Sequence, residues 1–205
     1  MKMASRRFLV CAMAVAVACV IGLAVEAGRA EPTPGLTGRY FHLSPPLTSL
    51  DQVNFSATAD DVVTDAQVLF PGTGGEFRPG LTGYLDNFAV EWTGLIRVDQ
   101  PGDITFTTRG DDASRLYIDG VLVAETDFVY KHIFEGVGTI NLSAGDHDLR
   151  MTYLEVEGFS NCLMEWDIGA GRTPVPADVL FTPEPASLSL LALGGLALLR
   201  RRRRV

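Results

Sequence analysis

The chain has 205 residues, which is enough for one domain of ordinary size together with terminal segments. Its formal net charge is −8, but nine of the 17 Lys and Arg residues lie in residues 1–30 and 183–205, whereas only two of the 25 Asp and Glu residues do. The middle therefore carries eight basic and 23 acidic residues, a charge near −15, which argues against nucleic acid and anionic lipid and favours cations or neutral ligands.

The N-terminal segment has the order of features found in a secretory signal peptide. Basic residues precede an unbroken apolar run, residues 8–25, and small residues follow it. We predict a signal peptide over residues 1–30, cut by signal peptidase after Ala27 or Ala30. The run is long for a signal core and just reaches the length of a membrane span, so an uncleaved anchor remains the alternative.

Residues 31–176 show no long period of 3.6 residues, and consist of short alternating segments separated by Gly, Pro, Asp and Asn. Asp119 and Gly120 are typical of a two-residue hairpin turn. The pattern predicts an all-β domain, an antiparallel sandwich or barrel with sheets that have one wet face. The clearest predicted strands are residues 103–108, 114–119, 147–155 and 161–166.

The segment of residues 62–87 is rich in glycine and weakly patterned, so we expect a long excursion over the surface. Its glycines do not form a phosphate loop, because no Lys-Ser or Lys-Thr pair follows them. If the domain binds a sugar, we expect the specificity to reside in this segment and in residues 155–161.

Cysteine, aromatic and histidine residues favour packing over chemistry. Cys162 is the only cysteine outside the signal run, which excludes an intramolecular disulfide and zinc binding by paired cysteines, and its alternating context places it in the core. The aromatic residues expected in the core rather than against a sugar are Tyr40, Trp92, Tyr130 and Trp166. The histidines, which lack zinc-binding spacing and are expected at the surface, are His42, His132 and His147.

Asp111 and Asp112 stand side by side between two predicted strands, although like charges repel. Ca²⁺ takes roughly six to eight oxygen ligands, and two neighbouring carboxylates can converge on it only if the backbone turns sharply between them. In a metal-free alternative, Asp112 caps the turn with its own side chain, and Asp111 forms an ion pair with Arg109 or Arg115.

The last 23 residues combine a Pro-Glu-Pro tripeptide, an apolar run over residues 186–199 and five arginines at residues 200–204. Arginines directly after an apolar helix indicate the positive-inside stop of a short membrane segment rather than a nucleic-acid signal. This order resembles the PEP-CTERM sorting signal, with Pro183, Glu184 and Pro185 as its tripeptide, and we assign residues 177–205 to a linker and this sorting segment. The resemblance implies export, transient anchoring in the inner membrane, cleavage by an exosortase, and release to the cell surface or an exopolysaccharide matrix.

The middle of the chain resembles a PA14 domain over essentially its whole length. The matching residues are "GLTGRYF" from residue 35, Trp92-Thr93-Gly94 followed by Pro101-Gly102, the aspartate pair with "LYIDG" from residue 116, and "CLMEW" from residue 162. The resemblance implies a β-sandwich or barrel of the kind found in adhesins, glycosidases, toxins and surface proteins, which often bind carbohydrate.

The resemblance also implies a metal site. In sugar-binding members, adjacent aspartates are joined by a cis peptide and hold a calcium ion that ligates sugar hydroxyls, which places Asp111 and Asp112 at the metal. Further ligands come from the loop between the last two strands, here residues 155–161, where Glu157 and Asn161 have suitable side-chain oxygens. Ala113 departs from the glycine that many members have after the aspartate pair.

These inferences lead to the hypothesis of an exported, non-catalytic domain that binds carbohydrate or exopolysaccharide through calcium at the cell surface or in the extracellular matrix. The main alternative is a structural or protein-interaction domain without metal or sugar, whose acidic surface only keeps a secreted protein soluble. A third alternative, an enzyme such as a glycoside hydrolase, requires a placed pair of carboxylates, which abundance alone does not locate.

Overall fold

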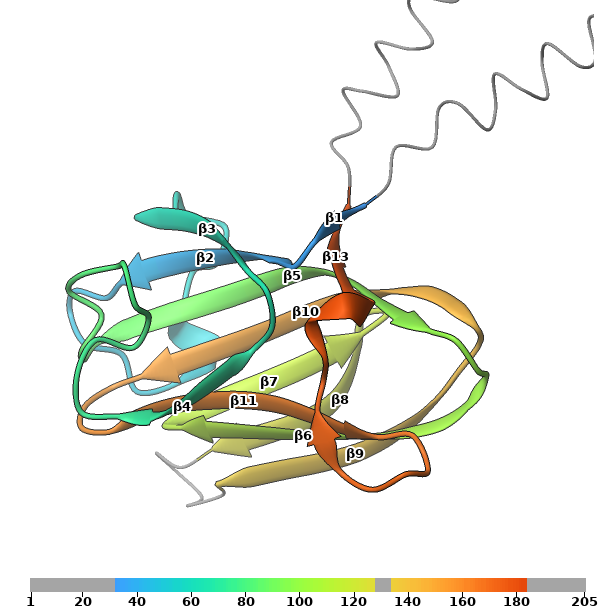
Figure 1. Cartoon of the computed structure of the whole chain (residues 1–205). Coiled ribbons are helices and arrows are strands. Elements are labelled where there is room, and N and C mark those ends of the chain that lie inside the picture. The colour runs from blue at the N-terminus through green and yellow to red at the C-terminus, as the bar shows by residue number, and fades with distance from the viewer. Residues whose placement is uncertain (1–31, 128–133, 184–205) are drawn as a thin grey trace, which may run out of the picture. The chain divides into compact units, whose positions relative to one another are not determined.

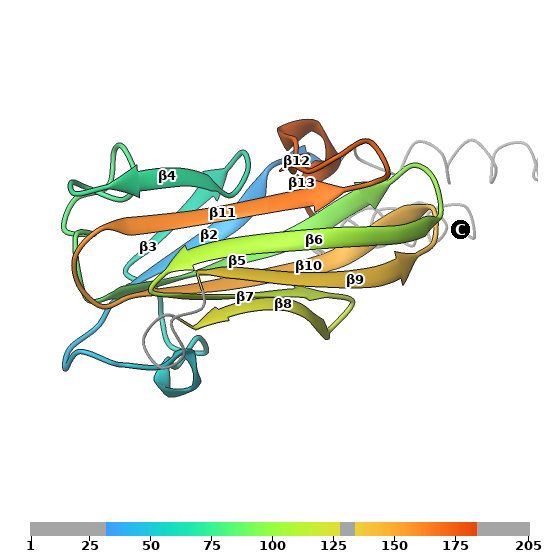
Figure 2. The same cartoon turned by 90° about the horizontal axis from the view of Figure 1, so that it is seen from below.

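The protein is described by a computed structural model over residues 32–127 and 134–183. Within these ranges the strands form two sheets packed face to face (Figure 1), and Figure 2 shows the smaller sheet in front of the larger one. The elements in chain order are β1 (Thr33–Pro34), β2 (Leu36–His42), the 3-10 turn η1 (Leu50–Gln52), β3 (Asp61–Asp65), β4 (Leu69–Thr73), β5 (Phe88–Val98), β6 (Gly102–Asp111), β7 (Ala113–Ile118), β8 (Val121–Asp127), β9 (Glu135–Leu142), β10 (Gly145–Glu155), β11 (Ser160–Asp167), β12 (Thr173–Pro174), the 3-10 turn η2 (Ala177–Val179) and β13 (Leu180–Thr182).

The all-β sandwich predicted from the sequence is confirmed. Its larger sheet has the strand order β1-β13-β5-β10-β7-β8, with β2 paired to β5 and to β3, and its smaller sheet has the order β12-β11-β6-β9, with β4 paired to β11. The predicted signal peptide and the predicted apolar C-terminal segment lie outside the described residues. Within the described ranges, no helix has the length and apolar character that a membrane span requires.

Antiparallel registers bring four strand ends to one end of the sandwich. β5 and β10 pair from Phe88 opposite Glu155 to Val98 opposite Gly145, and the last residue of β6, Asp111, lies opposite Asn161 of β11. We call this end, which holds Phe88, Asp111, Glu155 and Asn161, the loop end. The opposite end, which holds Val98 and Gly145, is the turn end.

The strands of the smaller sheet bury alternate side chains, as the sequence predicts. Ile104 and Phe106 of β6 and Met164 and Trp166 of β11 are buried in the interface between the sheets. Each large apolar side chain so buried stabilises the fold by about 1.5–3 kcal/mol. Cys162 is fully buried, which confirms that it is a core residue.

Two buried aromatic residues, Tyr40 and Trp92, donate hydrogen bonds to the same carboxylate, that of Asp65. Tyr40 and Trp92 are fully buried, as predicted, whereas Tyr130 lies outside the described residues. The Tyr40 hydroxyl and Trp92 Nε1 each donate a hydrogen bond to Asp65 Oδ2 at 2.8 Å, and Arg78 Nε donates to Asp65 Oδ1 at 2.6 Å. Asp65 therefore links the larger sheet to the segment that follows β3.

The segment of residues 62–87 is not the surface excursion that its sequence suggests. It contains most of β3 and all of β4, and its apolar residues Val68, Phe77 and Tyr84 are buried. The ring centroids of Phe77 and Tyr153 lie 5.0 Å apart in a stacked arrangement. The prediction is wrong because the few apolar residues are spaced too irregularly to show a period, although all three side chains enter the core.

Both ends of the compact unit lie on neighbouring strands. The unit runs from Thr33 to Pro183, and β1 pairs with β13 through Thr33 opposite Thr182. Leu180 of β13 is fully buried and its carbonyl accepts a hydrogen bond from the Gly35 N–H at 2.8 Å. The unit therefore extends beyond residue 176, the boundary expected from the sequence.

The two sheets approach each other closely where β8 meets β9. A Cβ added to Gly138 would lie 1.7 Å from the Val123 carbonyl oxygen, and one added to Gly136 would lie 2.0 Å from the Glu125 carbonyl oxygen. No side chain fits at either glycine while the backbones keep this separation. The Gly-Val-Gly sequence of β9 therefore allows the sandwich to close along this edge.

His147 connects two turns at the turn end and is buried, contrary to the surface position expected from the sequence. Its Nδ1 lies 2.7 Å from Asp119 Oδ2, and its Nε2 lies 3.0 Å from the Ser143 carbonyl oxygen. Both partners are acceptors, so only the doubly protonated ring can donate to each of them. Burial lowers the pKa of His147. The two hydrogen bonds and the charges of Asp119 and Asp146 raise it by more, so the net shift is upward.

We expect His147 to make stability fall as the pH rises. A histidine with a raised pKa in the folded state contributes stability that is complete below about pH 6.5, its ordinary pKa, and is lost as the pH passes the folded value. In urea unfolding, the wild type should therefore lose more of its free energy of unfolding between pH 6 and pH 9 than His147→Gln does. Equal losses in the two proteins would contradict a charged His147.

Candidate functional site

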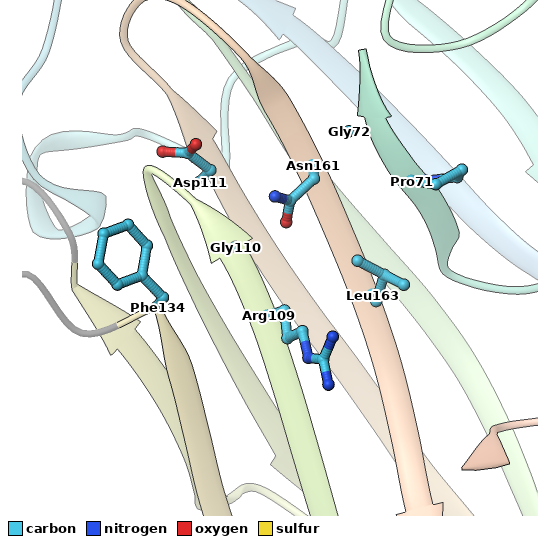
Figure 3. A pocket seen from close by; sticks show the side chains of 8 residues that line it. All are labelled: Pro71, Gly72, Arg109, Gly110, Asp111, Phe134, Asn161 and Leu163. Atoms are coloured by element: carbon cyan, nitrogen blue, oxygen red, sulfur yellow. The ribbon is translucent and has the colours of Figure 1, made fainter.

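The loop end is built around the aspartate pair that closes β6. The peptide bond between Asp111 and Asp112 is cis, as the resemblance implies. Asp111 is half-buried and lies directly opposite Asn161 in the ladder of β6 and β11. Figure 3 shows Asp111 and Asn161 on neighbouring strands, among the residues that line a pocket. The strand register thus brings one carboxylate and one carboxamide together from residues that are far apart in the sequence.

Asp112 fixes the backbone of the loop that joins β10 to β11. It is 5% exposed, and its Oδ2 accepts a hydrogen bond from the Val156 N–H at 2.7 Å. The backbone of Glu157 supplies a second hydrogen bond to the same carboxylate. The side chain of Glu157 is exposed. All four predicted ligand residues therefore lie at the loop end, and Asp112 also acts as a cap of backbone amides.

The arginines considered as metal-free partners of Asp111 pair elsewhere. Arg109 Nε lies 3.1 Å from Glu135 Oε2, and Arg109 Nη2 lies 3.4 Å from Glu165 Oε2. Arg115 pairs with Asp51 and Glu125, at 2.5 and 3.3 Å. Within residues 32–127 and 134–183, no ion pair of Asp111 is found, so the two arginines do not offset its charge.

A buried glutamate lies beneath the pair. Glu155 is fully buried, and its Oε2 lies 2.7 Å from the hydroxyl of Tyr153. The same hydroxyl also donates to the backbone carbonyl of Asp111. A phenol has a single hydrogen, so it satisfies both partners only if Glu155 is protonated and donates to the Tyr153 oxygen.

The acidic groups raise one another's pKa values. Burial, together with the charges of Asp112, Asp111 and Asp86, raises the pKa of Glu155 to about 9 against the opposing effect of the hydrogen bond to Tyr153. Burial also raises the pKa of Asp111, with a further contribution from Asp112. For Asp112, burial outweighs the opposing effect of the two backbone hydrogen bonds, and the pKa is raised. The loop end therefore has excess negative charge that a cation would neutralise.

Three buried oxygens at the loop end have no hydrogen-bond partner among the described residues: Asn161 Oδ1, Glu155 Oε1 and Ser160 Oγ. A buried polar atom without a partner costs about 1–3 kcal/mol, so such atoms are uncommon unless they serve a ligand. In the part of the chain that the structure describes, no three His, Cys, Asp or Glu side chains converge in a metal-binding group. A cation here would therefore be held by the aspartate pair, the Asn161 amide and backbone carbonyls, which are the oxygen ligands that Ca²⁺ accepts.

A pocket of about 340 Å³ opens on the outer face of the smaller sheet beside Asp111. Figure 3 shows Asn161 pointing between Asp111 and Arg109, with the ring of Phe134 on one side and Leu163 on the other. Phe134 is 57% exposed. The pocket is lined by Pro71, Gly72, Arg109, Gly110, Asp111, Phe134, Asn161 and Leu163.

The comparison with family models decides the family. The PA14 domain model matches residues 47–174, more than half of the chain. The chain belongs to the PA14 domain family. The model of the PEP-CTERM protein-sorting motif matches residues 181–204, which marks this PA14 protein for export and processing at a membrane. No curated protein matches the chain.

Solved structures share the sandwich of this PA14 domain. An anti-sigma factor domain-containing protein from Clostridium clariflavum is 26% identical, with a TM-score of 0.57 over 74% of this chain and 48% of its own, so the chain spans about half of its length. A PA14 sugar-binding domain from an RTX adhesin is 19% identical, with a TM-score of 0.57 over 74% and 99% of the two chains. The A domain of epithelial adhesin 6 from Candida glabrata, solved in complex with Galβ1-3GlcNAc, is 14% identical, with a TM-score of 0.59 over 76% and 89%.

Sequence reasoning missed three residues at the loop end of this PA14 domain. Glu155 ends a predicted strand and was not distinguished from its exposed neighbours, because burial cannot be read from an acidic residue at a strand end. Asp86 lies in the segment expected on the surface. Phe134 follows a weakly patterned stretch. The antiparallel order of β5 and β10 is the one signal for Asp86, since it places the start of one strand beside the end of the other.

Proposed function

We propose that this PA14 domain binds carbohydrate through a calcium ion held by Asp111, Asp112 and Asn161, with Glu157 and loop carbonyls completing the shell. The observation that carries the proposal is the buried, unpartnered Asn161 Oδ1 directly opposite an aspartate that has no ion pair among the described residues. Oxygen ligands of this kind suit Ca²⁺ rather than a transition metal.

The residues of the loop end fit that ion chemically. A bound calcium ion would offset the repulsion of the acidic cluster and leave coordination positions for sugar hydroxyls. Asp112 holds the backbone amides of Val156 and Glu157, so it fixes the backbone of the loop that follows β10. Tyr153 holds the carbonyl of Asp111 from below and so orients the pair.

Three observations support carbohydrate as the ligand. Two of the structures that share the fold are a PA14 domain called sugar-binding and an adhesin domain in complex with Galβ1-3GlcNAc. The exposed ring of Phe134 beside Asp111 offers an apolar surface for the C–H face of a sugar. Arg109, the cationic residue in the pocket lining, already pairs with Glu135 and Glu165, which favours a neutral sugar over an anionic one.

We propose a binding role rather than a catalytic one. The loop end holds four carboxylates that could act as an acid or a base. Asp112 and Glu155 are buried and hydrogen-bonded to neighbouring groups, so only Asp111 and Glu157 of these four are accessible. The sorting motif supports a role at the cell surface or in an exopolysaccharide matrix after processing by an exosortase.

The proposal is tested by thermal unfolding of the purified protein after chelation and on addition of CaCl₂. A ligand that binds only the folded state adds about 2.7 kcal/mol of stability at a hundred times its Kd. We expect a rise in Tm in the wild type, no rise in Asp112→Asn, and an undiminished rise in Asp103→Asn, a matched change of an exposed aspartate at the turn end.

The sugar is then tested by retention on immobilised monosaccharides, with and without calcium. Calcium-dependent retention of the wild type that Asp112→Asn lacks would support the full proposal. An unchanged Tm in the wild type at millimolar calcium would contradict the metal site and favour the structural or protein-interaction role.

A further inference from the structure

The loop between β10 and β11 is held from a second direction by the turn that precedes β5. Asp86 Oδ1 accepts a hydrogen bond from the Gly158 N–H at 2.9 Å, and the Asn87 N–H donates to the Val156 carbonyl at 3.1 Å. Asn87 has a φ of +54°, a conformation that asparagine tolerates better than most residues. These bonds grip the loop on both sides of Glu157.

The two clamps on the loop act at different points. Asp112 engages the amides of Val156 and Glu157 from within the sandwich, whereas Asp86 engages Gly158 from the surface. Gly158 has a φ of +106°, which glycine adopts at little cost. Because glycine has no side chain to restrict its backbone, the conformation at Gly158 depends on these hydrogen bonds. Without the Asp86 bond, the tip of the loop would be fixed only through Asp112, the backbone bond from Asn87 to Val156 and the flanking strands.

We propose that Asp86 is a positioning residue of the site: through Gly158 it sets the backbone of the β10–β11 loop so that the loop oxygens and Asn161 face Asp111 and Asp112. This inference rests on the proposed calcium site. It assigns to Asp86 an acceptor role that depends on a hydrogen bond and not on its charge, because the Gly158 N–H needs only an oxygen at the position of Oδ1.

The distinction between acceptor and charge gives a direct test. In a calcium titration followed by Tm, Asp86→Ala should bind at least about fivefold more weakly than the wild type, in line with the loss of one exposed hydrogen bond that orders a loop. Asp86→Asn keeps an amide oxygen and should stay within about twofold. Asp103→Ala removes an equal charge at the turn end and should leave the affinity unchanged.

A second measurement does not depend on calcium. Phe159 follows Gly158 and is 68% exposed, so chymotrypsin can report on the loop by cutting after it. In chelator, the cut located by mass spectrometry should be at least about threefold faster in Asp86→Ala than in the wild type, and near the wild-type rate in Asp86→Asn.

The outcomes separate the two proposals. Weak binding by Asp86→Asn as well as Asp86→Ala would make charge the operative property and overturn the positioning role. Equal cleavage and equal affinity in all variants would also overturn it. If the wild type binds no calcium, the proposed function fails, and slow cleavage of the wild type and Asp86→Asn beside fast cleavage of Asp86→Ala would still establish that Asp86 positions the loop.

Discussion

Replacing Asp65 with alanine is expected to cost about 3–5 kcal/mol of folding free energy, the range seen when one partner of a buried ion pair is removed. The carboxylate is 5% exposed and accepts from Tyr40, Trp92 and Arg78. Its loss leaves a hydroxyl and an indole N–H without acceptors inside the core, together with a half-buried guanidinium. The effect should also loosen β4, which follows Asp65 closely and pairs with β11 beside Asn161.

Urea unfolding at pH 7 measures this cost. Asp103→Ala is the matched control, because Asp103 is exposed and accepts one hydrogen bond from Asn141 at 2.7 Å, so its loss should change the free energy of unfolding by less than about 0.5 kcal/mol. A loss below about 1 kcal/mol for Asp65→Ala would mean that the three donors find water or other partners.

Replacing Glu155 with glutamine is expected to stabilise the protein by several kcal/mol at pH 8 in the absence of calcium, because pH 8 lies about 3.5 pH units above the ordinary pKa of 4.5 and each unit is worth about 1.36 kcal/mol. The pKa of Glu155 is raised from its ordinary 4.5 to about 9 in the folded state. A group with a raised folded pKa contributes stability that is complete below pH 4.5 and is lost as the pH rises toward 9. Glutamine keeps the shape and the hydrogen bond to Tyr153 but cannot ionise, so the variant avoids this loss.

Unfolding at pH 4.5 and at pH 8 in chelator distinguishes this cause from a change in packing. The two proteins should have nearly equal free energies of unfolding at the lower pH and diverge at the higher one. Glu157→Gln, in the same loop but exposed, should follow the wild type at both values. A Glu155→Gln variant that is less stable than the wild type at pH 8 would contradict a Glu155 whose raised pKa lowers the stability of the wild type at that pH.

The fold follows from the sequence where a two-residue period is long enough to read. β11 alternates over its whole length and β10 over residues 146–151, and the Asp-Gly turn after β7 marks a hairpin. The segment around Phe77 and Tyr84 gave no such period, because its burial depends on where the chain lies over the core and not on regular alternation. Tertiary contacts such as the ring stack of Phe77 on Tyr153 decide such a segment.

The candidate site was predictable to the extent that it consists of a local motif. Asp111 and Asp112 are adjacent in sequence, and Asn161 begins a readable strand whose register places it opposite Asp111. The contribution of Asp86 could not be derived, because a hydrogen bond between residues 72 positions apart has no local signal. The protonation of Glu155 could not be derived from the sequence either, because it depends on complete burial beside like charges.

The pairing of β1 with β13 puts the two ends of the described unit side by side, away from the loop end. β13 contacts β5 at Leu95 and Ile96, whereas the loop end lies at Phe88 of the same strand. Seven residues of strand separate Phe88 from Leu95, which is about 24 Å at roughly 3.4 Å per residue. The first and last described strands, β1 and β13, therefore lie well away from Asp111, and a ligand at the loop end would not contact either of them.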